Sequence, residues 1–301
     1  MSIDDDEHSY TLSMAENAID SGLFDEARDI SNYLSDGSRY FIDAIIMLTE
    51  SDVDGALKSI ESCINSVRNP KSREPILEAR ARMIRGLART SLGETTEGGS
   101  DLRWAMDRLS TIADGSDEHG IAILNVAAWH RQQSEIVMSL ATHSEIARES
   151  SHSPEIVAVS RHRVASIHSE MGDYTSALRH HWTAWKLADE CSIDAIAESS
   201  CLHVLDLGLT MVSESVERLD DQVKNAAPGP RSPTSSSIHP DDLNEAIVWI
   251  TPRSLVRLSG HSRPDLSLII ESHKILNIEL PIELVNNKHD IEDQDVLDVL
   301  Q

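Results

Sequence analysis

The recurrence of apolar and small residues at helical spacing most constrains what this chain can fold into. The pattern runs from about Tyr10 to Val223 with only short breaks, and no alternation typical of strands persists along it. Aromatic residues make up 4% of the chain and apolar residues 40%. That mix suits closely packed helices better than a large β-sandwich, which relies on aromatic and β-branched residues. The sequence therefore predicts an all-α protein.

Several helix boundaries are marked by capping residues. Asp52 and Asp173 stand where their carboxylates can accept free backbone N–H groups, and Ser153 precedes a proline at a first helical position. Gly22, Gly93 and Gly172 close helices where a left-handed residue is needed. The expected helices are 8–21, 24–35, 39–50, 53–67, 73–92, 100–113, 117–133, 134–149, 154–171, 174–190 and 193–224.

The expected helices come in pairs, and the clearest pair is centred on Gly172. Small residues at Ala165, Ala177 and Ala184 allow two antiparallel helices to approach, while Tyr174 fills the wedge after the glycine turn. This pattern resembles the tetratricopeptide repeat (TPR), with Gly-x-Tyr at the turn followed by spaced alanines. The resemblance implies an α-solenoid of about five or six diverged TPR-like helical hairpins, with a small C-terminal helical element.

Weaker copies of the pattern flank the clearest one, and together they cover roughly residues 8–224. Ala18, Gly22 and Ala27 repeat the small residue, the turn and the following alanine. Another copy continues to Trp104 and Ala105 after residues 94–99, which we expect to form an inserted loop. The spacing is irregular, as expected for a diverged array.

The composition changes after Asn225. Residues 226–240 are rich in Pro, Gly and Ser, which predicts a flexible linker between a repeat domain, 1–225, and a small helical segment, 241–301. We expect this segment to cap the end of the stack. A winged-helix unit is the alternative, although a basic recognition helix is missing.

The net charge is −25, from 26 basic and 51 acidic residues, and this disfavours nucleic-acid binding. Three cysteines without CxxC spacing predict neither a disulfide framework nor a zinc site. The N-terminus lacks the apolar run of a signal peptide, and no stretch approaches the roughly 18 apolar residues of a membrane span. We therefore expect a soluble, cytoplasmic, acidic protein without membrane contact.

An arginine stripe is the sharpest candidate for a binding site. Arg82, Arg85 and Arg89 fall at i, i+3 and i+7 on one expected helix and share a face. In the TPR family the first helix of each repeat lines a concave groove, where guanidinium groups can bind a partner's carboxylates bidentately. The alternative is that these arginines form ion pairs with Glu74, Glu78 and neighbouring acids. The expected peptide-binding set is Arg82, Arg85, Arg89, Asn125, Trp129, Gln133, Arg161 and His162.

Other chemistry finds little support in the sequence. Adjacent His180 and His181 point about 100° apart on a helix, which disfavours a shared metal site and favours core or groove histidines. No GxGxxG, Walker P-loop, GxSxG or HExxH pattern occurs, so we expect no catalytic residues and no cofactor.

The sequence therefore predicts a non-enzymatic scaffold or adaptor that binds an acidic or C-terminal peptide of another protein in the concave groove. Two alternatives stay open. One is a sensory module that binds a small anionic ligand, and the other is a helical enzyme whose site is not recognised.

Overall fold

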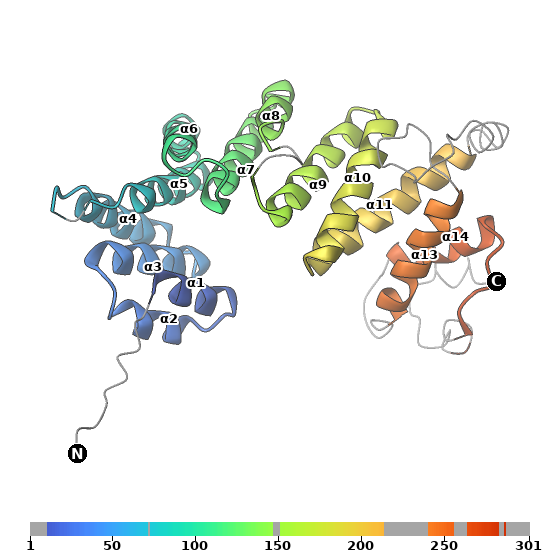
Figure 1. The fold of residues 1–301 in the computed structure, drawn as a ribbon, viewed down its shortest axis with the longest axis horizontal. Coiled ribbons are helices and arrows are strands. Elements are labelled where there is room, and N and C mark those ends of the chain that lie inside the picture. The colour runs from blue at the N-terminus through green and yellow to red at the C-terminus, as the bar shows by residue number, and fades with distance from the viewer. Residues whose placement is uncertain are drawn as a thin grey trace, which may run out of the picture. The chain divides into compact units, whose positions relative to one another are not determined.

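The computed structural model describes residues 11–71, 73–146, 151–213, 240–255, 264–282 and 286 (Figure 1). Every regular element in these ranges is an α-helix. The chain divides into two compact units, Met1–His152 and Ser153–Gln301.

The first unit is built from helical hairpins in which the second helix of each pair packs against the first. The first helices of neighbouring hairpins also contact one another, α1 with α3 and α3 with α5. These hairpins therefore stack one on the next. The helices are α1 (Leu12–Asp20), α2 (Phe24–Ser31), α3 (Asp36–Thr49), α4 (Val53–Val67), α5 (Pro75–Ser91), α6 (Thr95–Ile112), α7 (Asp117–Gln132) and α8 (Ile136–His143).

Apolar clusters join each hairpin of this unit to the next. Ile19, Ile42 and Ile46 lie in one cluster, Phe41, Ile60 and Leu77 in the next, and Leu102, Leu109 and Val126 in a third. Because each cluster takes side chains from two neighbouring hairpins, no hairpin buries its apolar face alone.

The second unit contains α9 (Pro154–Glu170), α10 (Tyr174–Glu190), α11 (Asp194–Ser213), α13 (Pro240–Leu255) and α14 (Pro264–Ile275). One core joins all five, with the fully buried Trp185 packed among residues such as Leu205, Ile247 and Ile269. The C-terminal helices therefore share the core of α9–α11. Most of the expected linker, residues 226–239, lies outside the described residues, as do 287–301.

Most helix boundaries match the sequence prediction. Helices 53–67 and 174–190 are reproduced, and Asp52 and Asp173 cap them by accepting the backbone N–H groups of Gly55 and Ser176. Ser153 precedes α9 but its side chain makes no capping hydrogen bond.

A left-handed residue recurs in the turn of each hairpin. Gly22, Gly93 and Gly172 take this conformation with φ between 74° and 85°, as expected. Ser51 and Ser134 hold the equivalent place in the α3–α4 and α7–α8 hairpins with φ of 65° and 62°. A serine there costs roughly 1 kcal/mol, so tertiary packing holds the turn where the glycine is missing.

The expected loop at 94–99 is wrong, because α6 already begins at Thr95. Gly98 lies where α5 and α6 touch, and a Cβ on it would come within 2.7 Å of the Gly86 carbonyl oxygen. A Cβ on Gly99 would come within 2.3 Å of the Trp129 ring. These glycines permit close helix packing and do not break the helix, which a reading of the sequence alone cannot distinguish from a loop.

Candidate anion-binding site

The arginine stripe of α5 makes ion pairs within its own unit. Arg85 donates two hydrogen bonds to the Asp101 carboxylate, at 2.6 and 2.8 Å, and one to Glu61 at 2.7 Å. Arg89 donates to the same Asp101 carboxylate at 2.8 Å. The side chain of Asp101 is only 6% exposed. The hydrogen bonds that Arg85 donates to Asp101 raise the pKa of Arg85 above its usual value. This network joins α5 to α4 and α6.

Arg82 lies 3.9 Å from the Asp101 carboxylate and packs against an aromatic ring. Its guanidinium stacks over Trp104 of α6 at 3.8 Å from the ring centroid, and burial lowers its pKa. Glu78 lies 3.6 Å from the Nε of Arg82 and accepts a hydrogen bond from Arg68 at 2.7 Å. The Glu78 ion pair considered from the sequence is therefore present, and Glu78 is the charge that Arg68 and Arg82 share.

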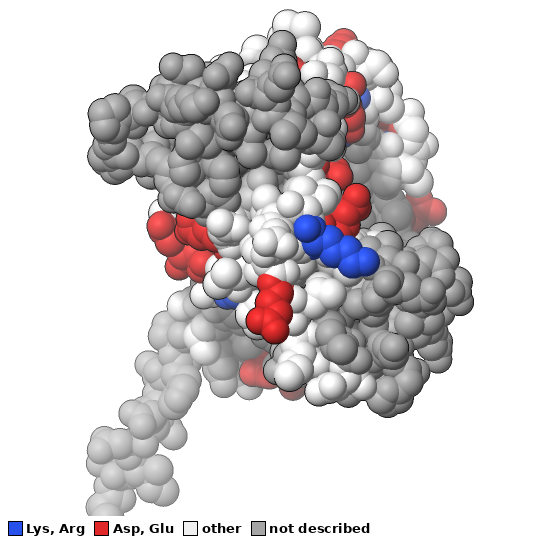
Figure 2. Space-filling model, turned by 90° about the vertical axis from the view of Figure 1, so that its right-hand side faces the viewer, with Lys and Arg blue, Asp and Glu red and all other residues white. Residues whose placement is uncertain are grey.

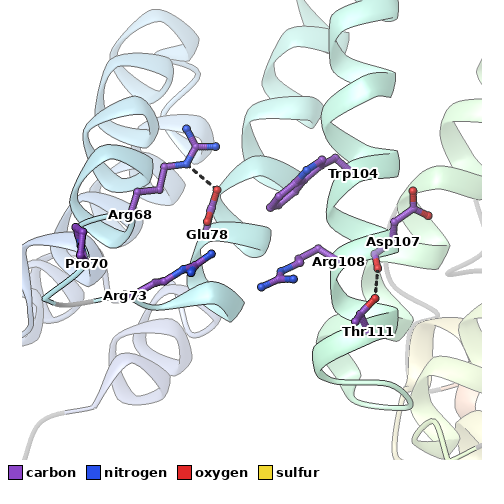
Figure 3. Close-up of a pocket in the computed structure, with 8 residues that line it drawn as sticks. All are labelled: Arg68, Pro70, Arg73, Glu78, Trp104, Asp107, Arg108 and Thr111. Carbon is purple, nitrogen blue, oxygen red and sulfur yellow. Dashed lines mark hydrogen bonds and ion pairs between the residues drawn. The ribbon is translucent and has the colours of Figure 1, made fainter.

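An open cavity of about 670 Å³ lies beside these residues (Figure 3). It is bounded by the end of α4, the segment that leads into α5, and one face of α6. The lining residues are Arg68, Pro70, Arg73, Glu78, Trp104, Asp107, Arg108 and Thr111.

Arg73 and Arg108 extend toward one another across this cavity from opposite walls (Figure 3). Neither forms an ion pair or hydrogen bond with an acidic group in the part of the chain that the structure describes. Arg68, on the same lining, is instead bonded to Glu78. Two guanidinium groups therefore face one space without an ion-pair partner among the described residues, in a chain of net charge −25.

The expected peptide-binding set contains neither Arg73, which precedes α5, nor Arg108. The signal that could have found it is on α6, where Trp104, Arg108 and Thr111 fall at i, i+4 and i+7 and so share one helix face.

The predicted residues of α7 lie elsewhere in the same unit. Trp129 is 8% exposed, packs between α6 and α7, and donates its indole N–H to the Thr95 carbonyl oxygen at 3.0 Å. Asn125 is partly buried, and Gln133 is the C-cap residue that follows α7. Contact of these three with a partner stays a prediction, and the burial of Trp129 leaves little of its ring for one.

Arg161 and His162 belong to α9 in the second unit, so the predicted set is divided between the two units. His162 shares a hydrogen bond of 2.9 Å with Ser200 of α11 and lies 5.6 Å, centroid to centroid, from the His181 ring. His181 is fully buried, stacks on His203 at 4.5 Å, and its two ring nitrogens have no hydrogen-bond partner within the described ranges. Burial lowers the pKa of His181 to about 3, so it is a neutral core residue at pH 7.

The side of the first unit lined by first helices has a different charge. A cavity of about 440 Å³ there is bounded by residues of α1, α5 and α7, among them Glu16, Asp117 and Glu118. Arg80 also lines it, but its guanidinium is paired with Glu16. This side therefore presents carboxylates. Figure 2 shows a different face, the right-hand side of the view in Figure 1, and acidic side chains predominate over basic ones among its described residues.

Two other kinds of feature are missing from the described residues. No group of three or more His, Cys, Asp or Glu side chains there is arranged to hold a metal ion. No helix there has the length and apolar character that would let it cross a membrane.

Burial raises the pKa of the Cys63 thiol to about 12, which makes it an inert core residue.

Comparison with known proteins identifies the fold. No protein-family model matches the chain, and no curated protein matches its sequence. The C-terminal part of a TPR repeat-containing protein from Cytophaga hutchinsonii is similar in structure, with a TM-score of 0.50 and 13% identity over 97% of this chain and 100% of that one. A Rap protein complexed with competence and sporulation factor aligns with a TM-score of 0.48 and 12% identity over 93% of this chain and 77% of that one. The all-helical class expected from the sequence is confirmed, and the chain has the fold of a diverged TPR-like helical repeat protein.

Proposed function

We propose that this chain is a non-enzymatic interaction scaffold whose first unit binds an acidic segment of a partner protein at the cavity between α4 and α6. One observation carries the proposal. Arg73 and Arg108 face this cavity and have no acidic partner within the described residues, although the chain has 51 acidic residues and only 26 basic ones.

The electrostatics of the cavity support an anionic ligand. Two guanidinium groups directed into one space repel each other, and an anion placed between them removes that repulsion. Guanidinium forks bind carboxylates bidentately, which gives orientation as well as affinity. The carboxylates on the first-helix side would repel the same ligand, so the charge pattern favours one face of the unit over the other.

In this proposal the arginines of the stripe, Arg82, Arg85 and Arg89, position the walls of the cavity. Arg85 and Arg89 hold α6 against α5 through Asp101, and Arg82 holds the Trp104 ring at the cavity wall. Direct contact of these arginines with a partner stays a prediction, and each would have to exchange an internal acceptor for an external one. The TPR-like fold is compatible with a scaffold because stacked hairpins present extended surfaces for partners.

A small anionic ligand is the second candidate, and the size of the cavity favours it. Its volume of about 670 Å³ falls within the ~300–1,000 Å³ range of small-molecule sites. A small anion that binds only the folded state would raise the melting temperature in the absence of any protein partner.

Affinity capture from the native lysate tests the proposal, with bound proteins identified by mass spectrometry. The test variant is Arg73→Ala/Arg108→Ala. The matched control is Arg39→Ala/Arg103→Ala, which removes the same charge from the same unit but from positions outside the cavity lining. The proposal expects a partner with an acidic segment that is held by wild type and control and lost by the test variant. Equal retention by all three proteins would contradict it.

A further inference from the structure

We propose that the cavity between Arg73 and Arg108 receives a phosphoryl group carried on a side chain of the bound partner. This inference rests on the proposed function and specifies the anion within the acidic segment.

The charge balance of the lining is the first argument. Three guanidinium groups and two carboxylates line the cavity. Glu78 is 8% exposed and already bonded to Arg68, so this pair adds no net charge. The Asp107 carboxylate is directed away from Arg108 (Figure 3). Arg73 and Arg108 are thus the two guanidinium groups of the lining that have no ion-pair partner among the described residues. A carboxylate would neutralise one of them, whereas a phosphoryl group carries about −1.5 to −2 at pH 7 and matches both.

The direction of the donors is the second argument. Arg73 and Arg108 approach from opposite walls, so their N–H groups converge on a ligand from two sides (Figure 3). A carboxylate is planar and offers two oxygens along one edge, which suits a single guanidinium fork. A phosphoryl group offers three strong acceptor oxygens in a tetrahedral arrangement, which two opposed forks can share.

The other walls favour a group that is attached to a chain. The cavity is far larger than one phosphoryl group, and Pro70 and the Trp104 ring give it apolar walls beside the arginines. A peptide that carries the phosphoryl group can pack on these walls, whereas free phosphate would leave them in contact with water. The occupant is therefore assigned as a phosphorylated segment of a partner.

The test uses the full chain and three peptide libraries that are identical except at one central position, which is Ser, Glu or phosphoserine. Retention on the immobilised protein is measured for wild type, for Arg73→Ala/Arg108→Ala, and for the control Arg39→Ala/Arg103→Ala. Wild type and control are expected to retain the phosphoserine library about tenfold better than the Glu library, because one more charge-assisted guanidinium contact is made. The test variant is expected to lose this preference. If that variant does not fold, Arg73→Gln/Arg108→Gln serves in its place and the same loss is expected.

The outcomes separate this inference from the proposed function. Equal retention of the Glu and phosphoserine libraries by wild type, with loss in the test variant, would overturn the phosphoryl group and leave the acidic segment standing. Retention of none of the libraries, while the partner captured from lysate still depends on Arg73 and Arg108, would likewise overturn only the phosphoryl group. The melting temperature of the wild type gives a further check. If inorganic phosphate raises it as much as the phosphoserine library does, the assignment to a partner's side chain is overturned. A phosphoserine preference that survives in both cavity variants would overturn the site.

Discussion

The first unit contains two groups of arginines, both between Arg73 and Arg108, and their surroundings differ. Arg85 and Arg89 share the nearly buried carboxylate of Asp101 and also contact Glu61. Arg73 and Arg108 face an open cavity without an acidic partner among the described residues. The ion pairs of the first group offset the cost of burying its charges and hold helices together. The guanidinium groups of the second group remain accessible to a ligand in the cavity. We infer that, in an acidic chain, an arginine without an internal ion-pair partner is the better candidate for binding.

Removing the shared carboxylate should have the largest effect. Asp101→Asn keeps the shape of the side chain but leaves Arg85 and Arg89 partly buried without their main counter-charge. We expect the free energy of unfolding of the first unit to fall by about 3–5 kcal/mol, as for other broken buried pairs. Equilibrium urea unfolding followed by circular dichroism measures this. Asp36→Asn, at an exposed ion pair with Arg39, is the control, and an effect as large there would contradict the distinction.

Lowering the pH should reduce the stability of the second unit, which contains buried histidines, more than that of the ion-paired helices of the first unit. The folded-state pKa of His181 is about 3 and that of His180 about 4, both lowered mainly by burial from 6.5. A lowered histidine pKa stabilises the fold above pH 6.5, and this stability is lost progressively as the pH falls below that value. Hydrogen exchange at pH 7.5 and 5.0, corrected for the intrinsic exchange rate, should show α9–α11 losing protection while α5 and α6 keep theirs.

A substitution at His181 sharpens that prediction. His181→Phe keeps a ring in the core and removes the titrating group, so the pH dependence of the second unit should become weaker. If the wild type and this variant lose protection equally on acidification, another group is responsible.

A smaller loss should follow when α5 and α6 are forced apart, since both arginine groups depend on this contact. Gly98→Ala places a Cβ 2.7 Å from the Gly86 carbonyl oxygen, and we expect a destabilisation of about 1–3 kcal/mol from overpacking. The melting temperature measures this. Ser110→Ala on the exposed side of α6 is the control. An unchanged melting temperature in Gly98→Ala would show that the two helices can separate without cost.

Much of the fold is predictable from the sequence because it rests on local signals. Helical periodicity, capping aspartates and the turn glycines locate most helices to within a few residues. The start of α6 is missed because Gly98 and Gly99 resemble a loop, and only contact with α5 and Trp129 shows that they permit close packing. The serines in two of the turns are missed for a similar reason, since their left-handed backbone is held by the surrounding structure.

The site is predictable only in part. The sequence shows that arginines concentrate before and within α5. It does not show which of them are neutralised, because Asp101 and Glu61 lie on neighbouring helices. Arg108 faces Arg73 only when α6 packs against α5, which brings together two residues about 35 positions apart in the chain. Pairing between helices therefore decides which arginines are available for binding.

Equilibrium unfolding of two double variants tests the distinction between the two arginine groups most directly. Arg73→Ala/Arg108→Ala should unfold with a free energy within about 0.5 kcal/mol of wild type, as expected for surface positions without partners. Arg85→Ala/Arg89→Ala, measured in the same way, should lose about 3 kcal/mol or more, because it leaves the nearly buried Asp101 with only Arg82, at 3.9 Å, as a counter-charge. Equal losses in the two variants would contradict the account, since the cavity arginines would then be structural as well.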